Sequence, residues 1–410
     1  MHSAAATAPT SRLAMFNALR SPNYRLYWIA QLISVTGQTM EYVALGWMVL
    51  HLTDSALSLG LTGLMQAAPR ILLALVGGAV ADRVNRQRLI MLTQATAGGL
   101  YFLIGFLVLT DLVQVWHVFT IAFIFGAVRS FDGPSRQAIL PHLVARDNIP
   151  NAVALGNLAW EMPRLIGPAI AGILIAAVGI GQTFVTAGFG FVIATVLYAL
   201  IHLDEAALRR SEHSLAHGML EGFTFIASSP ILLTLLGMTF FNSIFGMSYQ
   251  VLMPVFARDI LHAGSQGLGF LHASVGAGAI VGSIVAAASS QTGGRGVRAV
   301  AGATAFGLLL VGFAFSQMFL VSAALLFLMA IASNLYMVSV STMLQLRLPD
   351  EYRARVMGIW SLTWSLMPIG GTISGTVAEF AGAPVAVALG GFLVAAMALT
   401  VALPRVRRLE

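Results

Sequence analysis

The stretch GGAVADRVNRQR, residues 77–88, lies between two long apolar runs and determines how the rest of the chain is interpreted. Residues 82–88 alone hold one acid and three arginines, although only 9% of all residues are charged. Each flanking run has about 20 apolar residues, the length of a helix that crosses a bilayer. The stretch is therefore predicted to be a short turn between two membrane-spanning helices, and its arginines predict that the turn faces the cytoplasm.

The composition indicates a protein of the lipid bilayer. Hydrophobic residues make up 58% of the 410 positions, whereas soluble domains have about 45–50%. The chain has no cysteine, and all 22 basic residues are arginine. Thiolate chemistry, zinc bound by cysteine, a Walker lysine and lysine Schiff bases are thereby excluded. We expect no cofactor and no metal, and an energy source in an ion gradient, the substrate gradient or a partner subunit.

The arginines gather in short clusters at the ends of apolar runs. Although the net charge is +6, the clusters form no continuous basic face, so we expect no nucleic-acid partner. Arg136 and Arg146 are interpreted as loop residues of the cytoplasmic side. Hydropathy predicts twelve spans, and with this charge bias both termini are expected in the cytoplasm. The spans are 24–50, 56–81, 88–109, 115–140, 151–178, 182–202, 230–257, 264–290, 297–315, 318–346, 354–380 and 384–403.

The longest hydrophilic connection, residues 204–229, divides the spans six and six. We expect an N-terminal six-helix bundle with a short cytoplasmic tail over residues 1–203, a central cytoplasmic loop, and a C-terminal six-helix bundle over residues 230–410. Two dipeptides recur at nearly the same offset, as two parallel repeats would leave them. They are Ser21-Pro22 with Ser229-Pro230, and Leu59-Gly60 with Leu268-Gly269.

The polar turn also carries a family resemblance. The pattern Gly78-x-x-Ala81-Asp82-Arg83-x-Asn85-Arg86-Gln87-Arg88 resembles the loop between the second and third helices of the major facilitator superfamily of secondary transporters. The family usually has glycine where Asn85 stands, and asparagine also tolerates a left-handed backbone. The resemblance implies a conformational gating loop, in which Asp82 contacts the start of the eleventh span near Arg353 and Arg355. Its residues are Gly78, Asp82, Arg83, Arg86 and Arg88.

Five charged residues lie within apolar spans, where each costs at least about 2.5–3.5 kcal/mol at the bilayer centre. They are Glu41, Arg129, Asp132, Glu161 and Arg164, and all five are candidates for proton coupling. The pattern Phe125-x-x-x-Arg129-x-x-Asp132-Gly133 resembles the fourth-helix motif of proton-coupled members, whose arginine is implicated in proton transfer. A spacing of three also lets Arg129 neutralise Asp132, and Arg164 neutralise Glu161, so purely structural pairs remain open.

Glu41 has no arginine within one helical turn. We expect an unpaired carboxylate in an apolar wall, where desolvation favours the neutral form and the group can load and release a proton. The alternative is a glutamate in a wet vestibule without a coupling role. In the fifth span, Gly167 and Pro168 resemble the antiporter motif G-x-x-x-G-P-x-x-G-G, which implies exchange of substrate for protons. The chain departs from this motif at Pro163 and Ala171.

Polar and aromatic residues in the spans are candidates for a substrate cavity, although each could equally serve helix packing. They are Gln38, Tyr42, Asn242, Tyr249, His272, Asn334, Trp360 and Trp364.

The whole chain most resembles the bacterial drug and siderophore:proton antiporters, an enterobactin-exporter-like branch of the superfamily. The resemblance implies an all-α inner-membrane protein of two pseudo-symmetric six-helix bundles, not an enzyme. It implies multidrug-type efflux of an amphipathic small molecule in exchange for protons, by a monomer. Uniport or import of a metabolite without proton coupling is the alternative. An intramembrane enzyme or a receptor fits less well, because the sequence has no HExxH or GxSxG motif and two matched halves serve transport.

Overall fold

The computed structural model describes residues 12–202, 224–288 and 294–404, and every regular element in these ranges is helical. The N-terminal part contains η1 (Arg12–Arg20), α1 (Pro22–Thr53), α2 (Ala56–Leu72), α3 (Ala74–Arg83), α4 (Arg86–Leu109), α5 (Val115–Ile139), η2 (Leu140–His142), η3 (Arg146–Asn148), α6 (Ile149–Val178) and α7 (Ile180–Ala199). The C-terminal part contains α9 (Pro230–Phe241), η5 (Asn242–Gly246), α10 (Tyr249–Val255), η6 (Phe256–Ile260), α11 (Gly264–Ala288), α12 (Arg295–Ala314), α13 (Phe319–Arg347), α14 (Asp350–Thr363), η7 (Trp364–Leu366), α15 (Met367–Ala381), α16 (Ala383–Met397) and η8 (Ala398–Ala402).

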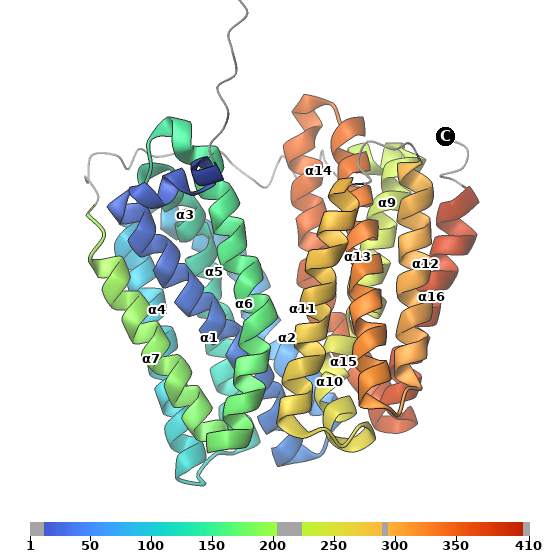
Figure 1. Cartoon of the computed structure of the whole chain (residues 1–410), viewed down its shortest axis with the longest axis horizontal. Helices are drawn as coiled ribbons and strands as arrows, with labels where there is room; N and C mark the ends of the chain where they lie inside the picture. Colours follow the sequence, from blue (N-terminus) through green and yellow to red (C-terminus); the bar gives the residue numbers. More distant parts are fainter. Residues whose placement is uncertain (1–11, 203–223, 289–293, 405–410) are drawn as a thin grey trace, which may run out of the picture.

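The helices form two groups that lie side by side (Figure 1). We call α1 to α7 the N-terminal half and α9 to α16 the C-terminal half. Within the N-terminal half α4 packs on α7 and α1 on α6, and within the C-terminal half α13 packs on α11 and α12. The halves are joined mainly by two helix pairs, α6 with α11 and α2 with α15. Most of the expected central loop, residues 204–223 of 204–229, lies outside the described residues.

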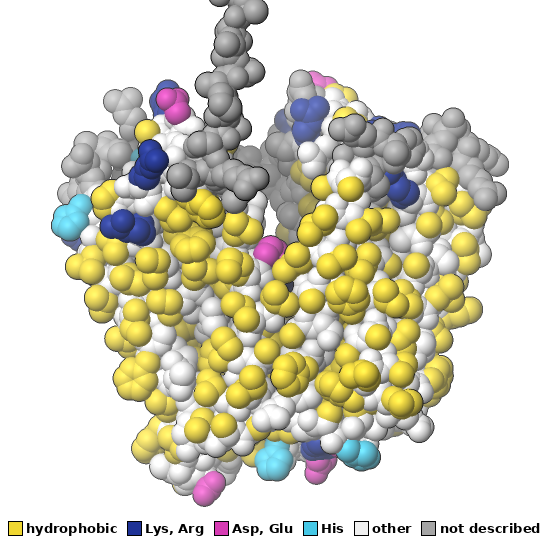
Figure 2. All heavy atoms as spheres, viewed as in Figure 1, with side chains coloured by type: hydrophobic (Ala, Val, Ile, Leu, Met, Phe, Trp, Pro, Cys, Tyr) yellow, Lys and Arg dark blue, Asp and Glu magenta, His cyan; other side chains and the backbone are white. Residues whose placement is uncertain are grey.

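The surface of the molecule fits a membrane. Figure 2 shows hydrophobic side chains over the middle of the visible face, with charged side chains mainly towards its two ends. In the part of the chain that the structure describes, nine helices are long and apolar enough to cross a membrane. The expected count of twelve is not confirmed. The span 24–50 falls in α1, which has the length but not the apolar composition, the span 56–81 is interrupted at Leu73, and the span 354–380 is not among the nine.

The polar turn is shorter than the sequence predicts. Because α3 ends at Arg83 and α4 begins at Arg86, only Val84 and Asn85 connect them. Asn85 has φ −62° and ψ 113°, so the turn does not use the left-handed backbone that asparagine tolerates. Its side chain instead caps α4, where Oδ1 accepts a hydrogen bond from the backbone N–H of Arg88 at 3.0 Å. A capping role explains asparagine at this position without any unusual backbone.

Glycines bring the two halves into backbone contact along two seams. At the α2–α15 seam, a Cβ added to Gly60 would lie 2.7 Å from the carbonyl oxygen of Gly371. At the α6–α11 seam, a Cβ on Gly269 would lie 2.6 Å from the carbonyl oxygen of Pro168. Small residues allow such close approach between membrane helices. Gly60 and Gly269 belong to the dipeptides that recur in the sequence, and each allows the close approach of two helices at its seam.

The hydrophobic core shows where the halves join and where they separate. One cluster includes residues of both halves, such as Met48 and Phe256. A second cluster lies in the C-terminal half and includes Val356, and a third lies in the N-terminal half and includes Tyr24. These two separate clusters lie towards the end that carries the α3–α4 turn and the start of α14, which we call the arginine-rich end. The halves therefore pack together towards the opposite end.

Candidate functional site

Glu41 lies at the centre of a polar network in the N-terminal half. Its side chain, on α1, is fully buried. Gln66 Nε2 on α2 donates to Oε1 at 2.7 Å, and Tyr101 Oη on α4 donates to Oε2 at 3.2 Å. Arg129 Nη2 on α5 donates to Oε2 and forms an ion pair. The expectation of an unpaired carboxylate is therefore wrong, because the partner comes from another helix, which spacing along α1 cannot reveal.

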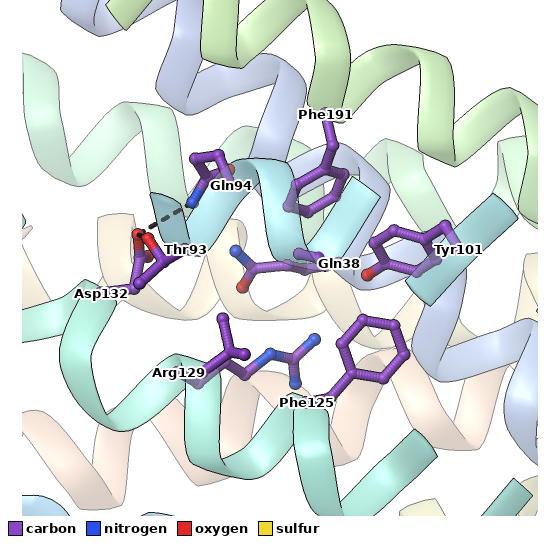
Figure 3. A pocket seen from close by; sticks show the side chains of 10 residues that line it. Gln38, Thr93, Gln94, Tyr101, Phe125, Arg129, Asp132 and Phe191 are labelled. Carbon is purple, nitrogen blue, oxygen red and sulfur yellow. Dashed lines mark hydrogen bonds between the residues drawn. The ribbon is translucent and has the colours of Figure 1, made fainter. Parts of the chain in front are cut away.

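Arg129 connects this network to a small cavity. Its side chain is 26% exposed, and its guanidinium lies 5.9 Å from the centroid of the Phe125 ring, within reach of a cation–π interaction. The side chains that line the cavity come from α1, α4, α5 and α7 and converge on a common space (Figure 3). They include Gln38, one of the residues expected in a substrate cavity. The labelled lining residues are Gln38, Thr93, Gln94, Tyr101, Phe125, Arg129, Asp132 and Phe191.

Asp132 forms a second buried network one helical turn away. Thr93 Oγ1 and Gln94 Nε2 donate to Oδ1 at 3.0 and 2.8 Å, and the second of these bonds is dashed in Figure 3. Arg136 Nε donates to Oδ2 at 2.6 Å. The same guanidinium donates to Tyr198 Oη at 2.6 Å and Ser34 Oγ at 3.0 Å. The network thus connects α1, α4, α5 and α7.

These two networks correct two expectations from the sequence. Asp132 does not neutralise Arg129, because Arg136 sits four residues further along α5 and Glu41 reaches Arg129 from α1. Arg136 is not a loop residue of the cytoplasmic side: α5 continues to Ile139, and the Arg136 side chain is 3% exposed. Arg136 lies near the end of the predicted span 115–140, where basic residues normally belong to cytoplasmic loops, so it was counted with the loop.

Glu161 and Arg164 pair with each other, as one sequence alternative has it. Arg164 Nη1 lies 3.4 Å from Glu161 Oε1, and the two side chains are 66% and 57% exposed for Arg164 and Glu161. An ion pair this exposed contributes little to stability. It differs in kind from the two buried pairs.

A larger cavity of about 500 Å³, including space open to solvent, lies between the two halves. Tyr42 of α1 and His272 of α11 both line it, and their rings pack edge-to-face with centroids 5.8 Å apart. Both were expected in the substrate cavity. Gln66, which donates to Glu41, also lines this cavity, and so does Gln250 of α10. The cavity therefore reaches the Glu41 network through one side chain, Gln66.

The other residues expected in the cavity lie apart from it. Tyr249 is buried in the core that both halves share, and Asn242 is buried without a hydrogen-bond partner for its amide. Asn334 Oδ1 accepts from Ser283 Oγ at 3.1 Å, which joins α13 to α11. Trp360 and Trp364 pack edge-to-face with centroids 6.5 Å apart. None of these five lines either of the two cavities.

The gating-loop residues lie at the arginine-rich end. Arg83 and Arg88 are exposed, and Arg86 lies 3.4 Å from His142 between guanidinium and ring nitrogens. Gly78 has open space where a Cβ would stand, whereas a Cβ on the neighbouring Gly77 would meet the Ser130 carbonyl of α5. The side chain of Asp82 lies outside the described residues.

The motif of the fifth predicted span lies where three helices meet. Gly167 on α6 lets Thr39 of α1 approach, because a Cβ there would lie 3.0 Å from the Thr39 Cβ. Thr39 Oγ1 donates to the carbonyl of Pro163 at 3.2 Å. Pro168 offers its carbonyl to the seam with α11 at Gly269. These residues therefore pack α6 against α1 of its own half and against α11 of the C-terminal half.

Sequence reasoning missed four partners, Gln66, Tyr101, Gln94 and Arg136. Each is a polar residue inside or at the edge of an apolar run, which is the signal that identified Glu41. Uncharged polar residues cost less in a bilayer than charged ones, so their presence in an apolar run is a weaker signal of function. Among the described residues, no group of three or more His, Asp or Glu side chains could hold a metal ion.

The chain belongs to the family of transmembrane secretion effectors within the major facilitator superfamily, because the family's model matches residues 13–410. It is a multi-pass membrane transporter and not an enzyme. The enterobactin exporter EntS of Escherichia coli is 27% identical over 350 residues, covering 83% of this chain and 81% of that protein. EntS of Escherichia fergusonii matches with the same identity and coverage.

Two solved structures share the fold. A bacterial homologue of the human lysosomal transporter Spinster, in an inward-facing and unoccupied conformation, has a TM-score of 0.68 at 15% identity and covers 93% of this chain and 94% of its own. A mutant of the nucleoside transporter NupG has a TM-score of 0.72 at 11% identity and covers 92% of this chain and 98% of its own. At these identities the likeness concerns the fold alone.

Proposed function

We propose that this protein exports an amphipathic small molecule, such as a drug, a siderophore or a metabolite, from a bacterial cell in exchange for protons. The observation that carries the proposal is the Glu41–Arg129 pair. It places a fully buried acid between a small cavity and the cavity between the halves. The likeness to an enterobactin exporter supports the direction of transport.

In this conformation Arg129, Gln66 and Tyr101 all donate hydrogen bonds to the Glu41 carboxylate. A proton on Glu41 would remove the counter-charge of Arg129, and leaving one partner of a buried pair unpaired is costly. Protonation therefore favours a different arrangement of α1 and α5. In our proposal, this difference couples the proton to the change between open states.

The packing supports an inward-facing state. The halves share a core towards one end, and each has a separate core towards the arginine-rich end. The Spinster homologue with the same fold is inward-facing. We place the arginine-rich end and both termini in the cytoplasm, with the protein in the inner membrane as a monomer. The twelve spans form two six-helix bundles, residues 1–203 and 230–410, around the central loop.

A second candidate is a uniporter or importer in which the charges are structural. Both buried acids that the structure describes have an arginine partner, Arg129 for Glu41 and Arg136 for Asp132. Pairs that never change protonation would look the same. Transport measurements with and without a pH gradient separate the two candidates.

The deciding variant is Glu41→Gln, reconstituted in proteoliposomes and tested with hydrophobic cations and siderophores. Glutamine resembles the protonated acid, so the variant should still exchange labelled substrate across the membrane. It should not accumulate substrate when a pH difference is imposed. The matched control, Glu161→Gln, removes an acid from the exposed pair and should retain pH-driven transport. If Glu41→Gln accumulates substrate at the wild-type level, the charges are structural and the second candidate is correct.

The orientation is tested with single cysteines in this cysteine-free chain. Asp147 lies in the α5–α6 connection of the arginine-rich end and Asp111 in the α4–α5 connection, and both are exposed. In intact cells a membrane-impermeant maleimide should label Asp111→Cys, and it should label Asp147→Cys only after lysis. The reverse pattern would invert the proposed orientation.

A further inference from the structure

We infer that the amide of Gln66 couples the cavity between the halves to the protonation of Glu41, and that the cavity takes an uncharged aromatic ligand with a hydrogen-bond donor. The inference rests on the proposed function, because it assumes that Glu41 exchanges a proton. Among the residues that the structure describes, Gln66 is the one that lines this cavity and whose side chain hydrogen-bonds to the Glu41 carboxylate. It is a positioning residue, since it acts through Glu41.

The orientation of the Gln66 amide follows from its partner. An ionised carboxylate only accepts hydrogen bonds, so the side that faces Glu41 must be Nε2, which donates at 2.7 Å. The carbonyl oxygen Oε1 is then left for another donor, and within the described part of the chain no side chain donates to it. The backbone holds the residue in place, because Gly126 of α5 lies so close to the Gln66 carbonyl that no Cβ would fit there.

Protonation of Glu41 reverses this arrangement. The acid would then carry an O–H that seeks an acceptor, which the Gln66 amide supplies by turning Oε1 towards it. The cavity would then face the two N–H groups of Nε2. The amide therefore presents an acceptor to the cavity when Glu41 is ionised and a donor when it is protonated.

The sign of the coupling follows from this exchange. A ligand that donates to Oε1 holds Nε2 on Glu41 and stabilises the carboxylate, so its binding releases a proton to solvent. By linkage, a higher pH strengthens binding of the same ligand. An exporter needs this sign, because it must give up its proton on the side where it takes up its substrate.

The chemistry of the cavity limits the ligand. Its lining contains no charged side chain, and the rings of Tyr42 and His272 offer faces and edges to an aromatic ligand. Thr62 already donates to the Ser58 carbonyl at 2.8 Å, so its hydroxyl oxygen is also left as an acceptor. An uncharged aromatic molecule with an N–H or O–H group fits these features.

Several other titratable or charged groups face this region from the packed helices. Arg129 and Tyr101 contact Glu41, and His272 and Tyr42 line the cavity. Arg70 of α2 interacts electrostatically with Arg129, and Arg164 of α6, which pairs with Glu161, interacts with Tyr249. His272 is the one among them that normally titrates near neutral pH. A test must therefore distinguish a pH dependence of binding that arises through Gln66 from one that arises at His272.

The test uses two uncharged probes of nearly the same shape, indole, whose N–H only donates, and benzofuran, whose oxygen only accepts. Their affinities for the purified full-length protein are measured by equilibrium dialysis at a series of pH values. Indole should bind more tightly as pH rises, by at most about tenfold per pH unit for one released proton. Benzofuran should show no such increase. Equal slopes for both probes, or no binding of indole, would overturn the inference.

Single substitutions then test which side chain makes the binding of indole depend on pH. Gln66→Met keeps the length of the side chain without the amide, so indole should bind with a flat pH profile. Gln250→Met is the matched control, because Gln250 lines the same cavity but bonds to Met247 and not to Glu41. It should keep the slope, as should His272→Asn. A slope that survives in Gln66→Met, or disappears in His272→Asn, would refute the role of Gln66.

The same data distinguish failure of the inference from failure of the proposed function. If wild-type protein has a flat indole profile and Glu41→Gln changes nothing, proton coupling through Glu41 is wrong. If wild type and Gln66→Met show the same pH dependence of indole affinity, and Glu41→Gln abolishes it, then Glu41 couples binding to protonation without the help of Gln66.

Discussion

The two halves of the protein treat buried polar groups in different ways. The N-terminal half buries Glu41, Asp132 and Arg136 and surrounds them with donors and acceptors. In the described C-terminal half every buried polar residue is uncharged, and several have no hydrogen-bond partner among the described residues, among them Asn242 and Ser374. The buried charged residues that the structure describes therefore lie in the N-terminal half.

The backbone differs in the same direction. The C-terminal half contains three π-helical segments, η5, η6 and η8, and the described N-terminal half contains none. π-helical turns cost regular hydrogen bonding and often occur at functional sites. We conclude that the N-terminal half is a regular frame for buried ion pairs, while the helices of the C-terminal half are less regular.

The largest effect should come from breaking a buried pair. Asp132→Asn leaves Arg136 as a buried charge without its carboxylate, and removing one partner of such a pair costs about 3–5 kcal/mol. The protein should lose that stability, measured as a lower melting temperature of the purified protein in detergent. The Thr93 and Gln94 contacts do not compensate, because they are made to the same carboxyl group.

The matched control for this prediction is Asn242→Leu in the C-terminal half. Because the Asn242 amide has no partner among the described residues, its removal loses no hydrogen bond, and stability should stay level or rise. If Asn242→Leu destabilises the protein as much as Asp132→Asn does, the contrast between the halves is wrong.

A smaller effect should follow from filling the seams. In Gly60→Ala and Gly269→Ala the new Cβ meets backbone, at 2.7 Å from the Gly371 oxygen and 2.6 Å from the Pro168 oxygen. Backbone cannot move aside without separating the helices, and overpacking of this kind costs about 1–3 kcal/mol. Such a cost shifts a two-state equilibrium by about 5- to 150-fold. Both variants should favour the state that is open at the end opposite to the arginine-rich end.

The reporter for this shift is a cysteine in place of Thr62, which is buried in the cavity between the halves. Its labelling by an impermeant maleimide should become faster in both alanine variants. Gly99→Ala is the control, because a Cβ at Gly99 has open space. If only one of the two variants accelerates labelling, the seams are not equivalent.

Much of this arrangement could be predicted from the sequence. The polar turn, Glu41 and Arg129 stood out because charge is expensive in an apolar run. The repeated Leu-Gly dipeptide marked two glycines that lie at equivalent seams. These features are local in the sequence, so composition and spacing are enough to find them.

The pairing of the charges could not be predicted. Spacing along one helix compares a residue only with its own helical neighbours, whereas Glu41 finds Arg129 across 88 positions of sequence. Arg136 was counted with the loops because it lies near the end of the span 115–140, whereas the structure buries its side chain within α5. At Asn85 the sequence allows a helix cap or a left-handed turn, because both favour the same residue type. Only the packing of helices decides between such alternatives.

The smallest effect should come from two charged contacts that the C-terminal half makes with helix ends of the N-terminal half. Arg258 Nη1 donates to the Leu50 carbonyl, at the C-terminus of α1, at 2.9 Å, and lies 2.7 Å from Asp54 Oδ1. Glu379 Oε2 accepts from the Leu57 N–H, at the N-terminus of α2, at 3.2 Å. A cation and an anion thus stand at the ends of the helix dipoles that favour them.

Arg258→Gln and Glu379→Gln should each weaken the closed end by about 0.3–1 kcal/mol, because the contacts are partly exposed. That cost corresponds to a shift of about two- to fivefold, seen as faster labelling of the Thr62→Cys reporter and reduced by added salt. Glu161→Gln breaks an exposed pair inside α6 and should change nothing. A shift in Arg258→Gln larger than that in Gly269→Ala would mean that charges, and not the glycine seams, hold the two unlike halves together.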